Sequence, residues 1–559
     1  AVELCGGLPL AIRIAAARLR SRPAWTTSDL VDRLRDHRRR LAELEVGPRS
    51  VSTALDLSYL ELGAQPRRAY RLLGLHPGVE LDGYAAAALI GASLDEAEQS
   101  IDGLLAAHLL DEPTPGHFRF HDLVRHHAMA TSVHEEPEAD RRDALTRLLD
   151  HYRHVASVAM DVGYPFERGR RPAVPHADSP SPTLRDEIEA IGWLDRELPN
   201  LLAAATHAAD HGWPDHVRQL SAVLFRHLRT RGRYSDAEIL HNRALTIARA
   251  VGDLRGEAEA LVDLGHADQR QGRLEPARGN YRLGLAAARA SGHRQVELDA
   301  LIYLGHMDRF ESHFEPAADN YEQAQQIART TGNRNAEVEA LIGLGWVRLS
   351  RDYEVGDEFE RALELARAVG NRAAEGVARS SIGHVHQLQG RYEDAIDAFE
   401  QALDLARSVG NRDGELSALT SLANALRIHG RSQRAAELYQ HVLSLARQVN
   451  SPVFELEAMQ GMGRLHHAAG RSRPALSHHQ RALDLAVDLR QPVAQARAHD
   501  GLAHAHSALG QPDRARQHWT DALAIFTDLA IDQPVADDVT TASIRAHLDQ
   551  LDRPTDAQG

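Results

Sequence analysis

A chain of 559 residues with 43% hydrophobic side chains can build several cores, so a single compact domain is not expected. Its net charge of −15 argues against a general nucleic-acid binder, because such proteins neutralise phosphates with basic side chains. All 64 basic residues are Arg and none is Lys, which excludes a phosphate-binding loop ending in Gly-Lys-Ser or Gly-Lys-Thr and excludes Schiff-base chemistry. We therefore expect that this chain alone is not an enzyme.

Cysteine usage and hydropathy indicate the compartment. Cys5 is the only cysteine, so no internal disulfide can form and a reducing environment is expected. The sequence has no apolar run long enough to cross a bilayer and no signal-peptide pattern. We expect a cytoplasmic protein without a membrane partner. The first residues lack a start Met and look like the interior of a helix, from which we expect a fragment of a longer protein.

The first 133 residues contain two recognisable segments. Residues 3–20 open with Gly6-Gly7-Leu8-Pro9 and continue as an apolar helix. Residues 51–133 predict four helices and then a β-hairpin, which together indicate a winged-helix domain. The helices are expected near 51–61, 66–75, 83–90 and 94–107, and the two strands at 109–112 and 118–120.

The next segments lead into a repeat array. Residues 134–185 predict a helical connector, 138–163, and a proline-rich linker, and residues 186–231 predict an atypical helical pair that caps a solenoid. The stretch from Gly390 to Arg412 then recurs through residues 232–531 as about eight helical hairpins of 40 residues. One step of the repeat, from Ser312 to Ser350, is 38 residues instead of 40. The shortening lies between Gly345 and Ser350, where five residues replace seven, so we expect one first helix to end early. Residues 532–559 predict a polar tail with one short helix near 540–551.

Each repeat has the chemistry of a helical hairpin. Ala395, Phe399 and Ala402 lie on one helix face, Gly410 supplies a left-handed cap, and Glu415 lies near the start of the next helix, where the helix dipole favours negative charge. The pattern resembles the tetratricopeptide repeat in a 40-residue form. Its aromatic column is Tyr281, Tyr321, Phe359, Phe399, Tyr439 and Trp519. The expected fold is therefore dominated by α-helices, with a winged-helix domain followed by a tetratricopeptide-repeat α-solenoid.

The N-terminal segments carry a second resemblance. Gly7-Leu8-Pro9-Leu10-Ala11 and Phe120-His121-Asp122-Leu123 resemble, in order and spacing, the tail of the NB-ARC module of STAND-class ATPases, in the form found in actinobacterial antibiotic-regulatory (SARP-type) regulators with tetratricopeptide arrays. The resemblance implies that residues 1–50 end the NB-ARC helical domain. It places the P-loop upstream, where a DNA-binding domain can also be found.

The same resemblance implies roles for three residues. Pro9 would approach the adenine, and His121 with Asp122 would match the sensor motif whose His contacts the β-phosphate of ADP. ADP or ATP with Mg²⁺ is therefore expected only in the full-length protein, and no cofactor is expected for this chain alone. An upstream nucleotide-binding domain is an implied partner, and nucleotide-dependent oligomerisation is implied for the full-length protein. The alternative is that His121 caps a helix.

Neither DNA nor a metal ion is an expected ligand of this chain. The candidate recognition helix, residues 94–107, carries four acidic residues and no basic one, so it should repel phosphates and serve domain packing. The adjacent pair His466-His467 cannot chelate one ion, because neighbouring helical side chains point about 100° apart. No HExxH or CxxC spacing occurs, so no metal site is predicted.

One polar column is a candidate partner site. It directly follows the small residue of each first helix, a position that faces the concave groove in tetratricopeptide proteins, although a solvated groove face is the plainer interpretation. The residues are His266, His306, Trp346, His384, Asn424, Arg464 and His504. We expect their side chains to lie outside the interhelical core and to bind a protein or peptide. Because imidazoles titrate near pH 6.5, affinity should change between about pH 6 and pH 8.

Two functions follow from these observations. The first is the sensor part of a STAND-class transcriptional regulator, whose solenoid binds a protein or peptide signal and whose winged helix helps to hold ADP in the off state. The alternative is a scaffold for protein–protein interaction that works without nucleotide.

Overall fold

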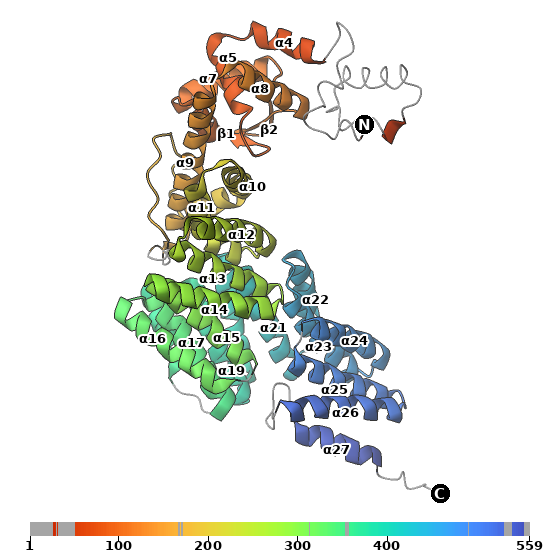
Figure 1. Ribbon diagram of the computed structural model, residues 1–559. Coiled ribbons are helices and arrows are strands. Elements are labelled where there is room, and N and C mark those ends of the chain that lie inside the picture. Colours follow the sequence, from red (N-terminus) through yellow and green to blue (C-terminus); the bar gives the residue numbers. More distant parts are fainter. Residues whose placement is uncertain are drawn as a thin grey trace. The chain divides into compact units, whose positions relative to one another are not determined.

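The computed structural model describes residues 26–28, 31, 51–165, 168, 171–311, 313–352, 357–489, 491–529 and 539–552. The chain falls into two units, Ala1–Leu224 and Phe225–Gly559, which are described separately (Figure 1). Almost all of the predicted 1–50 segment, including Pro9, lies outside the described residues.

The first unit begins with helices and a small antiparallel sheet. The helices expected from the sequence form within a few residues of their predicted bounds. They are α4 Val51–Glu61, α5 Ala64–Leu73, α6 Gly83–Ile90 and α7 Leu94–Ala106. A fifth helix, α8 Asp122–Glu135, follows the sheet and was not among those predicted. The sheet has the order β1-β3-β2, with β1 Leu81–Asp82, β2 Asp111–Thr114 and β3 His117–Arg119, and β1 is an addition to the predicted hairpin. Helices with a hairpin are what a winged helix requires, and that interpretation stays a prediction.

Side-chain caps set where these helices begin. Asp82 accepts a hydrogen bond from the backbone N–H of Ala85 at the start of α6. Ser93 and Glu96 form a reciprocal capping box at the start of α7. Such caps satisfy backbone donors that the first turn leaves unpaired.

Three further helices follow this sheet in the sequence. They are α9 Glu138–Gly163, α10 Glu187–His211 and α11 Pro214–Thr230. The expected connector helix thus forms with the predicted bounds. Residues 171–185 contain no helix or strand, as their proline content predicts.

The second unit is a stack of antiparallel helical hairpins, which run from α13–α14 to α25–α26 (Figure 1). The helices are α12 Tyr234–Val251, α13 Leu254–Arg270, α14 Leu274–Ser291, α15 Arg294–Phe310, α16 Phe314–Thr331, α17 Arg334–Asp352, α18 Glu358–Val369, α19 Arg372–Leu388, α20 Tyr392–Ser408, α21 Arg412–Ile428, α22 Ser432–Gln448, α23 Pro452–Ala468, α24 Ser472–Asp488, α25 Pro492–Ala508 and α26 Pro512–Asp528. The predicted α-solenoid is confirmed.

Close packing inside a hairpin depends on glycine in the first helix. A Cβ atom at Gly265, Gly305 or Gly383 would lie 2.7, 2.8 and 2.7 Å from a ring atom of the buried aromatic residue on the second helix. Glycine costs a helix about 1 kcal/mol relative to Ala, so it is favoured here because the ring needs the space. At α24 the aromatic position holds His479, which is buried between Gly463 and Gly501.

The turns between helices use the predicted left-handed cap. The backbone φ angle is 70° at Gly252 and 73° at Gly370, a region that glycine enters without strain. Asn450 takes the same conformation, with φ 51°, in a repeat that lacks the glycine. Asparagine is one of the few other residues that tolerates this region.

One expectation about the array is wrong and another is confirmed. The first helix of the 38-residue step does not end early, since α17 has 19 residues; instead the second helix, α18, has 12 against 17 or 18 in the other repeats. The short helix that the sequence predicts near residues 540–551 is confirmed. It is α27, Thr541–Asp552, and it buries Ile544 against Trp519 and Phe526. The apolar face of α27 thereby covers the last hairpin.

Candidate partner-binding wall

The polar column lies on successive first helices of the array, one residue per hairpin. His266 is on α13, His306 on α15, Trp346 on α17, His384 on α19, Asn424 on α21, Arg464 on α23 and His504 on α25. His266 is buried and the other six are half-buried. The expectation that these side chains lie outside the interhelical packing is therefore wrong. They form a partly covered wall rather than a solvated face.

Hydrogen bonds join this wall from one repeat to the next. The indole Nε1 of Trp346 donates to Ser381 Oγ at 3.0 Å. His384 Nε2 lies 3.1 Å from Ser421 Oγ on the following first helix. The rings of Trp346 and His384 meet edge to face with centroids 5.2 Å apart, and the guanidinium of Arg309 lies 5.6 Å above the Trp346 ring. Polar and aromatic contacts thus connect neighbouring repeats.

The surroundings of the wall keep its imidazoles neutral. Burial, with smaller contributions from Arg309, Arg229 and Arg270, lowers the pKa of His306 to about 3. Burial alone lowers the pKa of His384 to about 4. The expectation that these rings titrate near pH 6.5 is wrong, because desolvation penalises the charged form. Both rings stay uncharged between about pH 6 and pH 8, so they cannot change partner affinity there by titration.

A small cavity opens beside Trp346 and His384. Its volume is about 100 Å³. It is lined by residues of α17, α19, α20 and α21, including Val377, Ala402 and Ser417. Small-molecule pockets usually measure about 300–1,000 Å³, so this cavity is of the size that takes one side chain of a larger partner. Val377 is 43% exposed, which leaves an apolar group available at the rim.

An Arg–Glu pair bridges six of the turns that join the second helix of one hairpin to the first helix of the next. The Arg lies in the last turn of one helix and the Glu, eight residues later, in the first turn of the next. The pairs are Arg249–Glu257 at 2.8 Å, Arg289–Glu297 at 3.0 Å, Arg329–Glu337 at 2.8 Å, Arg367–Glu375 at 3.0 Å, Arg407–Glu415 at 3.0 Å and Arg447–Glu455 at 2.9 Å. The helix dipole alone does not account for the Glu at the start of each first helix, because an ion pair with Arg also holds it there. In the sequence, the Arg that recurs eight residues before each Glu could have predicted this pair.

The array also contacts itself across one superhelical turn. Arg270 Nη2 lies 2.6 Å from Asp413 Oδ1, and the hydroxyl of Tyr234 donates to the same carboxylate. Arg231 Nη1 donates to the carbonyl of Gly410, 179 residues away, at 3.2 Å. We call these five residues the closing contact. They join the start of the array to the turn between α20 and α21.

In the first unit, the two predicted sensor residues lie together at the start of α8. His121 is the residue before the helix and Asp122 is its first residue, and both are exposed. The His121 side chain makes no capping hydrogen bond, so the alternative role of helix cap is not what the structure shows. Pro9 cannot be placed beside them because it is outside the described part of the chain.

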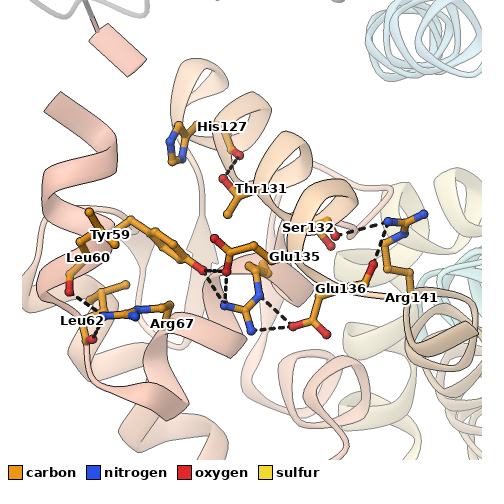
Figure 2. A network of polar contacts seen from close by, with 11 residues as sticks. Tyr59, Leu60, Leu62, Arg67, His127, Thr131, Ser132, Glu135, Glu136 and Arg141 are labelled. Atoms are coloured by element: carbon orange, nitrogen blue, oxygen red, sulfur yellow. Dashed lines mark hydrogen bonds and ion pairs between the residues drawn. The ribbon is translucent and has the colours of Figure 1, made fainter. Parts of the chain in front are cut away.

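A polar network holds α8 in position (Figure 2). Tyr59 on α4 donates to Glu135 Oε2 at 2.5 Å. Arg71 on α5 pairs with Glu135 at 3.0 Å and with Glu136 at 2.7 Å. These contacts hold the C-terminal end of α8 against α4 and α5.

The surface of α7 is acidic in the structure as well. Asp95, Glu96, Glu98 and Asp102 are all exposed to solvent. A helix with this face disfavours approach to a phosphate backbone. In the residues that the structure describes, no helix combines the length and apolar character needed to cross a membrane.

Sequence comparisons connect the chain with known proteins. The family model "Tetratricopeptide repeat" matches residues 226–290, 356–408, 376–448 and 414–488. Regulatory protein AfsR of Streptomyces griseus is 37% identical over 278 residues, and regulatory protein AfsR of Streptomyces coelicolor is 35% identical over 292 residues. These matches cover 49% and 50% of this chain. They cover 28% and 29% of the relatives, so the chain spans less than a third of their length.

A solved structure shares the fold. It is the STAND protein PH0952 of Pyrococcus horikoshii, which has a tetratricopeptide repeat sensor. The alignment covers 93% of this chain and 73% of that protein, with a TM-score of 0.50 and 13% sequence identity. At this identity the likeness concerns the fold.

Proposed function

We propose that this chain is the sensor part of a STAND-type regulator similar to AfsR, and that the wall of its solenoid binds a protein or peptide signal. The observation that carries the proposal is the half-buried wall with its side-chain-sized cavity beside Trp346 and His384. A partner that spans several repeats would place one apolar side chain in the cavity. Its backbone would meet the polar groups of the neighbouring repeats.

The first unit has a separate proposed task, which is to help hold ADP in the off state. His121 and Asp122 are exposed at the N-terminal end of α8, where unpaired backbone N–H groups favour an anion. In the full-length protein, His121 would contact the β-phosphate presented by the upstream nucleotide-binding domain. ADP or ATP with Mg²⁺ would be bound by that domain, and this chain would contribute only the sensor contact.

A pair of matched variants tests the wall. Val377→Glu places a charge at the rim of the cavity, whereas Val487→Glu places the same charge on α24 at a valine that is 54% exposed. In the full-length regulator, we expect V377E to lose signal-dependent transcription of a reporter and V487E to keep it. Equal reporter output from both variants, with helix content unchanged by circular dichroism, would contradict the wall assignment.

ADP binding distinguishes a sensor that helps to hold ADP from a scaffold that works without nucleotide. Equilibrium dialysis of ADP against the full-length protein should show weaker binding for His121→Ala. Unchanged ADP affinity and unchanged basal transcription would remove the sensor role of His121. They would favour the scaffold.

A further inference from the structure

The last hairpin of the array brings together three side chains that ligate metals in other proteins. His518 and Asp521 are three residues apart on α26 and therefore lie on one face of that helix. His499 projects from the facing helix, α25. One ligand atom from each lies within 4.8 Å of the others. Spacing rules for a single helix do not detect this group, because its members come from two helices.

The distances are close to those of a bound ion. His499 Nδ1 lies 3.0 Å from His518 Nδ1 and 4.0 Å from Asp521 Oδ2. Ligand atoms held at about 2.0–2.2 Å from a tetrahedral zinc ion are themselves about 3.3–3.6 Å apart. A small rotation of the Asp521 carboxylate, whose residue is partly exposed, would complete the geometry. Without an ion, two neutral imidazoles can share a contact between their Nδ1 atoms only if one carries the hydrogen and the other does not.

Neighbouring residues orient two of the three ligands. Gln517 Nε2 donates to Asp521 Oδ1 at 2.9 Å, which leaves Oδ2 directed toward the imidazoles. The buried ring of His506 stacks on His518 with centroids 5.4 Å apart and planes 9° apart. His506 is held in turn, because its Nδ1 lies 2.7 Å from Gln511 Oε1. A hydrogen-bonded partner such as Gln517 is typical of a metal-ligating carboxylate.

We propose that His499, His518 and Asp521 bind one divalent transition-metal ion of the zinc class, with water in the remaining position. Two imidazoles and one carboxylate suit such an ion, whereas calcium and magnesium prefer sites made of oxygen atoms alone. The ion joins α25 to α26. It therefore stabilises the hairpin that ends the array.

Zinc and cobalt titrations of the purified chain test this site. The protein must carry no polyhistidine tag, because a tag would bind the same ions. Isothermal titration calorimetry with Zn²⁺ should show a tight site of one ion per chain, and Co²⁺ should give the visible absorption of a site with nitrogen ligands. Saturating Zn²⁺ should also raise the Tm.

Three variants separate this group from the other histidines. His518→Ala and Asp521→Asn should weaken Zn²⁺ binding by at least about tenfold, since even the loss of a supporting partner costs about 10–100-fold. The control is the double variant His466→Ala with His478→Ala, which removes another pair of stacked imidazoles, 5.1 Å apart. It should keep both the affinity and the rise in Tm. No tight site in the wild type, or equal Zn²⁺ affinity in the wild type and D521N with unchanged helix content, would overturn the proposal.

Discussion

At the scale of single residues, the array is specified by pairs of a small and a large side chain across each hairpin. Phe399 is fully buried, and Gly383 on the facing helix leaves room for its ring. Gly279 on α14 has no such reason, since a Cβ atom there would meet nothing within 4 Å. Replacement of glycine by alanine should therefore have opposite effects on stability at Gly383 and at Gly279.

Gly383→Ala should destabilise the protein, whereas Gly279→Ala should stabilise it. At Gly383 the new methyl group would lie 2.7 Å from the Phe399 ring, and overpacking of this kind costs about 1–3 kcal/mol, more than the roughly 1 kcal/mol gained in helix propensity. At Gly279 only the propensity gain applies. Thermal unfolding measures both changes, and a stabilised G383A variant would show that the ring can move aside.

The half-buried imidazoles of the wall predict how stability depends on pH. The pKa of His306 is lowered to about 3 and that of His384 to about 4, against about 6.5 in the unfolded chain. Below about pH 6.5 the unfolded state takes up protons that the folded state does not, so stability is full above that pH and is lost as pH falls toward 4. We expect a Tm that is constant from about pH 7 to 8 and falls below about 6.5.

The control for this pH dependence is the double variant His306→Gln with His384→Gln. It should lose part of the fall in Tm between about pH 6.5 and 4, because its side chains do not titrate. An identical slope in wild type and variant would mean that these two rings are not the groups responsible.

At the scale of the element, the Arg–Glu pairs bind the end of one helix to the start of the next. The Glu415 side chain is only 6% exposed and accepts from Arg407 and Arg412 at 3.0 and 2.7 Å. Glu393 also forms an ion pair, with Arg431, but its side chain is 60% exposed. Burial of the acceptor distinguishes the two, because water competes for an exposed pair.

We expect Glu415→Ala to destabilise the protein by about 1–2 kcal/mol and Glu393→Ala by less than about 0.5 kcal/mol. Urea unfolding of the two variants under identical conditions compares them. A larger loss for E393A would contradict the view that the bridged turns stabilise the array.

The elements were largely predictable from the sequence, and their exceptions have physical causes. The 40-residue period predicts the hairpins because each packs mainly on its neighbours. It does not say which helix loses residues in the 38-residue step, since either helix of α17–α18 can shorten without changing the stack. Likewise, one polar residue in each first helix predicts that these residues form a common wall. It does not predict how much of each side chain the next repeat buries. That cover is why His306 and His384 are neutral rather than titrating.

At the scale of the whole molecule, the described part of the array turns far enough for distant repeats to meet. This was not predictable from the sequence, because the meeting depends on a small rotation that accumulates over several repeats. The closing contact is centred on Asp413, which Arg270 and Tyr234 both reach. Its loss should change the spacing of the superhelix without unfolding any helix.

Small-angle X-ray scattering should therefore show a larger radius of gyration for Asp413→Ala than for the wild type. Asp404→Ala, at an exposed position on α20, is the matched control and should leave the scattering curve unchanged. Superimposable curves for all three proteins would show that other contacts set the spacing of the superhelix.

The closing contact also changes how the array should fold. In an open repeat protein each unit contacts only its neighbours, so folding can nucleate anywhere and spread along the chain. Here Arg231 and Gly410, 179 residues apart in sequence, must meet before the structure is complete. Closing so long a loop costs entropy before its contacts form, which slows folding and raises cooperativity. Deleting hairpins from the C-terminal end one at a time should therefore lower stability in unequal steps, with the largest step where the deletion reaches α21.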